Sequence, residues 1–123
     1  MDVTKIAIVL FFIMFVYSGI SKILKFNDKV ATLGKKTGLP HIINALGMVG
    51  VLSLEIVGSL LLVLYFMKTN TISKKLAKLI TILFLLFLVV VTALYHPPWD
   101  KMIPFLSNVT TFAGMLLIYE KID

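Results

Sequence analysis

The single acidic side chain inside a long apolar stretch is the first candidate for chemistry in this sequence. Glu55 lies near the middle of residues 42–67, which contain no other charged residue. A charged side chain at the centre of a bilayer costs at least about 2.5 kcal/mol, so such residues usually face protein or water and have a function. We interpret Glu55 as a ligand- or proton-handling group. The alternative is a helix-packing carboxyl, protonated or hydrogen-bonded to Ser or Thr across a helix bundle.

Other polar residues lie toward the ends of three further apolar stretches. Ser18 and Lys22 are four residues apart, so they share one stripe of a helix. His96 follows the third stretch, and Asn108 lies within the fourth. With four alternating spans, these groups and Glu55 converge on a cavity that opens to one side of the membrane. The candidate ligand-binding residues are therefore Ser18, Lys22, Glu55, His96 and Asn108.

Each of these residues also has a simpler interpretation. Lys22 can be a residue at a helix end whose ammonium reaches the membrane surface, and His96 can be a helix cap. Counting helix rise from the expected start of each span places Glu55 about 20 Å deep and Lys22 about 3 Å deep. Lys22 is also a candidate counter-ion for Glu55 or for an anionic or carbonyl group on a ligand, but the difference in depth argues against a direct pair with Glu55. A water, a ligand or a second helix that starts above the bilayer would have to close the gap.

Composition indicates an integral membrane protein. Hydrophobic residues make up 59% of the 123 residues and charged residues 15%, whereas soluble domains average roughly half and about 25%. All twelve basic residues are lysines at the ends of apolar stretches, a pattern of membrane-edge anchoring that disfavours nucleic acid as a partner. With no Cys and only two His, we expect no metal site and no covalently attached cofactor.

Four apolar stretches are long enough to cross a bilayer. They cover about residues 6–24, 42–67, 76–95 and 102–119. Short connections between them predict an all-α, up-down-up-down four-helix bundle, a single transmembrane domain over residues 1–123. The first stretch lacks a suitable signal-peptide cleavage site, so we expect it to be retained as a membrane helix. Four glycines are expected to allow close helix packing: Gly19, Gly50, Gly58 and Gly114.

The first connection is the longest polar segment and predicts a short amphipathic helix. Asn27 or Asp28 would cap it, and it would end at Leu33 before Gly34. Its apolar side chains, Val30 among them, would face lipid and its lysines the headgroups.

Lysine counts do not determine orientation, because six fall on each side of the predicted bundle. If Lys22 lies inside the bundle and is not counted, the side with both termini gains slightly, which favours termini in the cytosol.

The order of several short motifs resembles the DoxX family of membrane proteins. Residues 15–23, FVYSGISKI, are similar to its first helix, and residues 55–62, EIVGSLLL, to its second. Gly38-Leu39-Pro40 is similar to the turn before that second helix. Asn108 and Gly114 fit the fourth helix. The positions that match the family pattern are Gly19, Lys22, Glu55 and Gly58.

The sequence departs from the family pattern at two places. Lysines 74, 75 and 78 stand where the family has Arg at the start of the third helix, and residues 95–99, YHPPW, are more distinctive than the pattern.

The resemblance implies a four-helix membrane bundle linked to redox processes. Some DoxX members are subunits of a thiosulfate:quinone oxidoreductase, and others associate with oxidative-stress enzymes. We therefore expect a membrane subunit that binds a quinone or similar lipid-soluble molecule near Glu55, with Lys22 and His96 beside the headgroup. It would act with a protein partner, because the chain has no evident electron carrier, and whether it is itself an enzyme stays open. The alternatives are a non-catalytic lipid- or sterol-binding protein and a structural subunit of a larger membrane assembly.

Overall fold

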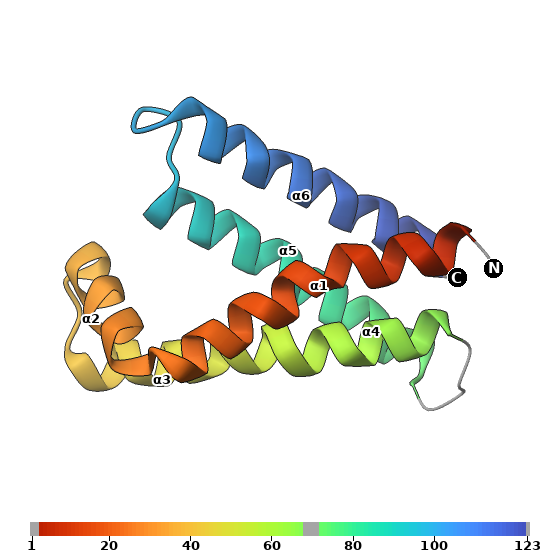
Figure 1. Ribbon diagram of the computed structural model, residues 1–123, viewed down its shortest axis with the longest axis horizontal. Helices are drawn as coiled ribbons and strands as arrows, with labels where there is room; N and C mark the ends of the chain where they lie inside the picture. The colour runs from red at the N-terminus through yellow and green to blue at the C-terminus, as the bar shows by residue number, and fades with distance from the viewer. Residues whose placement is uncertain (1–2, 68–71, 123) are drawn as a thin grey trace. The chain divides into compact units, whose positions relative to one another are not determined.

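The computed structural model describes residues 3–67 and 72–122, and this part of the chain is helical with short turns and no strand. It forms two compact units, residues 1–73 and 74–123, each of which is described by itself. Figure 1 shows the elements of both. The first unit contains α1 (Val3–Leu24), α2 (Phe26–Thr37), α3 (His41–Ser53), the π-helix η1 (Leu54–Gly58) and α4 (Ser59–Phe66). The second contains α5 (Lys74–Tyr95) and α6 (Met102–Lys121).

Four helices are long and apolar enough to span a membrane, as predicted. They are α1, the continuous run His41–Phe66 formed by α3, η1 and α4, then α5 and α6. Their ends lie within three residues of the predicted ones. Only 11 to 28% of each apolar window is buried, so most of the apolar side chains on these helices are available to lipid. The chain is thus an all-α, multi-pass membrane protein, while the relative order of the four spans in a bundle stays a prediction.

The amphipathic helix in the first connection is present, but its predicted ends were wrong. α2 begins at Phe26, and the amide of Lys29 donates to the Lys25 carbonyl at 3.0 Å, so helical bonding resumes one residue after α1 ends. Lys25, rather than Asn27 or Asp28, occupies the N-cap position, without a side-chain cap. Gly34 lies inside the helix, where glycine costs only about 1 kcal/mol relative to alanine.

α2 ends at the glycine whose backbone is left-handed. Gly38 has φ of +70°, and its amide donates to the Gly34 carbonyl at 2.9 Å. A side chain is strained at such a φ, whereas glycine adopts it freely, so the helix stops there rather than at Gly34.

The apolar side of α2 packs on α3 instead of facing lipid. Val30 is only 1% exposed, which corrects the expectation that it contacts the bilayer. The turn between the two helices is fixed by Asn44, which is 2% exposed. Its Nδ2 donates to the carbonyls of Leu39 (2.9 Å) and Pro40 (3.2 Å), and its Oδ1 accepts a hydrogen bond from Thr37 Oγ1 at 2.8 Å. These bonds hold α2 in one orientation on the first turn of α3.

Replacing Asn44 by Ala should loosen this turn. Three hydrogen bonds are lost, and at a net value of about 0.5–1.5 kcal/mol each the local free energy of opening should fall by about 1.5–4.5 kcal/mol. Hydrogen exchange should become faster over residues 38–44 while the spans keep their protection. Asn27→Ala on the exposed side of α2 is the matched control. Unchanged exchange in Asn44→Ala would show that the turn does not depend on this side chain.

In the second unit, α5 and α6 form an antiparallel pair (Figure 1). α5 ends at Tyr95, immediately before His96 and the two prolines, as predicted, because proline cannot donate a hydrogen bond to the preceding turn. Near the other end of the pair, Lys78 Nζ lies 5.6 Å from the centroid of the Tyr119 ring, a cation–π contact.

Candidate functional site

The structure brings three of the five candidate residues together between α1 and the second span. Lys22 Nζ lies 2.8 Å from Glu55 Oε1 and donates a hydrogen bond to Ser18 Oγ at 2.6 Å. Glu55 is almost completely buried, with 3% of its side chain exposed, whereas 19% of the Lys22 side chain is exposed. A buried carboxylate and its cation thus form a compact polar cluster, the Lys22–Glu55 site, inside an otherwise apolar helix pair.

The direct contact of Lys22 with Glu55 corrects the prediction that their depths are too different. Glu55 follows His41 by fourteen residues, a rise of roughly 21 Å, whereas Lys22 is two residues from the end of α1. The two helices therefore do not start at one level. The first turns of α3 extend past the end of α1 and pack against α2. α3 is therefore a helix that starts above the bilayer, which is one of the ways expected to bring Lys22 and Glu55 to the same depth.

A glycine permits the close approach that the ion pair needs. A Cβ built on Gly19 would lie 2.5 Å from Ile56 Cγ1 and 3.4 Å from Glu55 Cβ, and the shorter distance is a clash. Gly19 therefore has the helix-packing role expected of it. At Gly50 a Cβ would meet no atom within 4 Å, so no contact in the described residues accounts for that glycine. Gly58 is buried and Gly114 half-buried, and their packing roles stay predictions.

Glu55 lies in the π-helix η1, which no sequence pattern predicts. π-Helices are rare, occur mostly as single turns inside α-helices, and are frequent at functional sites. Ser59 is the first residue after η1. It is fully buried, and its Oγ has no hydrogen-bond partner in the described part of the chain. It lies four residues after Glu55. Its small size was noticeable in the sequence, but nothing there indicated that its hydroxyl would be buried and unsatisfied.

Polar atoms at the Lys22–Glu55 site can make further hydrogen bonds. Glu55 Oε1 is buried with the Lys22 ammonium 2.8 Å away as its charged neighbour, and no other donor among the described residues reaches it. Buried polar atoms are nearly always hydrogen-bonded, and exceptions ask for an explanation. Oε1 can still accept a hydrogen bond, and Ser59 Oγ can accept or donate one.

The other two candidates, Asn108 and His96, lie in the second unit. Asn108 Nδ2 donates to Thr92 Oγ1 at 3.1 Å, and Thr92 Oγ1 in turn donates to the Leu88 carbonyl at 2.6 Å. His96 is half-buried directly after α5, with its amide bonded to the Thr92 carbonyl. Asn108 thus links α5 and α6. A single cavity that joins all five candidates stays a prediction.

No cluster suited to a metal ion is found within residues 3–67 and 72–122, where no three His, Asp or Glu side chains gather. No protein-family model, curated protein or solved structure matches the chain. The resemblance to the DoxX family is therefore carried by its motifs alone, two of which supply the residues of the ion pair.

Proposed function

We propose that the Lys22–Glu55 site binds the polar head of a lipid-soluble molecule, a quinone or a compound of similar chemistry. The observation that carries this proposal is the buried ion pair in a membrane-spanning helix pair, with Glu55 four residues before the buried and unsatisfied hydroxyl of Ser59. Ionisable groups inside membranes are rare and commonly mark sites for ligands, ions or protons. The resemblance to DoxX proteins, some of which belong to a quinone-reducing complex, gives the ligand class.

The chemistry of the two side chains suits such a head group. A lysine ammonium has three N–H donors; one goes to Ser18 and one faces Glu55, so Lys22 keeps a third for a ligand carbonyl oxygen. Glu55 Oε1 can accept a hydrogen bond from the hydroxyl of the reduced form. The apolar tail would lie among the exposed aliphatic side chains of the spans. Electrons would come from a protein partner, because the sequence has no cysteine to carry them.

Removing the carboxylate charge should weaken binding. In Glu55→Gln, a charge-assisted hydrogen bond worth about 1.5–3 kcal/mol becomes a neutral one worth about 0.5–1.5 kcal/mol, so the Kd for a short-chain quinol should rise roughly five- to tenfold. The measurement is a titration of detergent-purified protein with the short-chain quinol and quinone, with helical content checked by circular dichroism.

Glu120→Gln is the matched control, because Glu120 is an exposed carboxylate at the end of α6. It should bind as the wild type does. Wild-type affinity in Glu55→Gln would remove Glu55 from the site. Binding of a sterol or phospholipid in place of the quinol would identify the non-catalytic lipid-binding alternative.

A further inference from the structure

The helix between the first two spans carries a row of lysines that the Lys22–Glu55 site does not use. α2 with its N-cap residue holds four lysines and one aspartate. At 100° per residue, Lys25, Lys29 and Lys36 fall within about 40° of one another around the helix axis. The fourth, Lys35, lies on a different face, about 80–120° around the helix axis from the row. We call Lys25, Lys29 and Lys36 the α2 lysine row.

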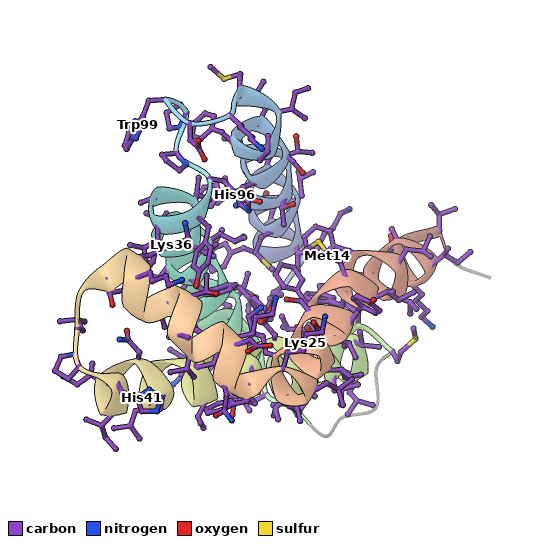
Figure 2. All side chains as sticks on the ribbon, turned by 60° about the vertical axis from the view of Figure 1, so that its left-hand side comes forward. Met14, Lys25, Lys36, His41, His96 and Trp99 are labelled. Carbon is purple, nitrogen blue, oxygen red and sulfur yellow. The ribbon has the colours of Figure 1, made fainter. Side chains whose placement is uncertain are left out.

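The contacts of α2 with α3 fix the direction in which this row points. A neighbouring side of α2, about 100–120° around the helix axis from the middle of the row, is occupied, because Val30 is buried and Asn44 ties Thr37 at the end of the helix to α3. These contacts hold α2 in one orientation about its axis. Lys25 and Lys36 are exposed, and Lys29 is half-buried. Figure 2 shows Lys25 at the junction of α1 with α2 and Lys36 toward the far end of α2.

The position of α2 in the chain determines what surrounds the row. One residue separates α2 from the membrane span α1, and three residues separate it from the span that starts at His41. A polar helix tethered this closely at both ends lies at the bilayer surface, among the lipid headgroups.

We propose that the α2 lysine row binds the phosphate groups of anionic phospholipids in the surrounding bilayer. Each lysine held near an anionic membrane surface raises the association constant for that surface about fivefold. Clusters of four to eight basic residues beside a membrane span or on an amphipathic helix typically bind anionic lipids. α2 with its N-cap residue carries four lysines, the row and Lys35, and the spans on either side hold it at the surface, so the row can select which lipid occupies the adjoining positions. This site is separate from the Lys22–Glu55 site and does not depend on its function.

The test compares two triple variants that lose the same charge. Lys25→Gln, Lys29→Gln and Lys36→Gln are combined in one protein. The control combines Lys75→Gln, Lys101→Gln and Lys121→Gln, three exposed lysines outside α2. Each protein is placed in nanodiscs of phosphatidylcholine with a minority of phosphatidylglycerol, and the preference for phosphatidylglycerol is measured by native mass spectrometry of the released protein–lipid complexes.

The wild type and the control variant should prefer phosphatidylglycerol about tenfold or more, and the α2 variant should lose most of that preference. Raising the salt from about 0.1 M to about 1 M, which shortens the Debye length from about 10 Å to about 3 Å, should weaken the wild-type preference. A variant with Arg at the three α2 positions should keep it, which separates loss of charge from loss of fold. Equal preference in the α2 variant and the wild type would overturn the proposal. So would displacement of the lipid by inorganic phosphate alone, which would indicate a soluble-anion site.

Discussion

Replacing Lys22 by Met should destabilise the first unit by about 3–5 kcal/mol. The change leaves the Glu55 carboxylate buried without the ammonium that lies 2.8 Å away, and an unpaired buried charge is costly. The measurement is the free energy of unfolding in mixed micelles, followed by circular dichroism. Lys25→Met, three residues further along and exposed, is the matched control and should change stability by less than about 1 kcal/mol.

A double-mutant cycle then isolates the pair. Lys22→Met with Glu55→Gln removes both charges, so the combined variant should be more stable than the sum of the single effects predicts, by about 2 kcal/mol. Additive effects would mean that the two side chains do not interact, and would contradict the ion pair.

Replacing Gly19 by Ala should have the second largest effect on the free energy of unfolding. The added Cβ would lie 2.5 Å from Ile56 Cγ1, so the Ile56 side chain must move or the two helices must separate, at a typical cost of about 1–3 kcal/mol. A separation of the helices also lengthens the distance from Lys22 to Glu55, so we expect quinol affinity to fall together with stability. Thermal unfolding in detergent and the quinol titration measure the two effects.

Two further variants of the first unit make the Gly19 prediction specific. Gly50→Ala meets no atom within 4 Å and should be neutral or stabilising by up to about 1 kcal/mol, because alanine favours the helix over glycine. Ile56→Ala removes the two side-chain carbons nearest to Gly19 and should restore part of the stability when combined with Gly19→Ala. A Gly19→Ala protein as stable as Gly50→Ala would show that α1 and the second span are not in close contact.

The spans could be predicted from the sequence because hydropathy and length depend on composition alone. Glu55 and Lys22 could each be selected, since a charge in or next to an apolar stretch is conspicuous. Their contact could not, because counting depth from the start of each span assumes that both helices begin at one membrane plane. α3 begins well beyond the end of α1, and that offset comes from the packing of α2 on α3.

The details of α2 and of η1 depended on contacts that a sequence pattern does not contain. Gly34 and Gly38 are both plausible helix ends, and the buried Asn44 beside the turn favours the second. No residue pattern predicts the π-helix around Glu55. The sequence therefore does not indicate that the Ser59 hydroxyl is buried without a hydrogen-bond partner among the described residues.

The most direct test of the central claim, that the Lys22–Glu55 site holds a lipid-soluble molecule, is to identify what the purified protein carries. Wild-type, Glu55→Gln and Glu120→Gln proteins are purified in mild detergent and extracted with organic solvent, and the extracts are identified by chromatography and mass spectrometry. We expect a near-stoichiometric quinone in the wild type and in Glu120→Gln, and little in Glu55→Gln. A quinone retained equally by all three, or no retained molecule in any of them, would contradict the claim and leave the ion pair as a contact that only joins the two helices.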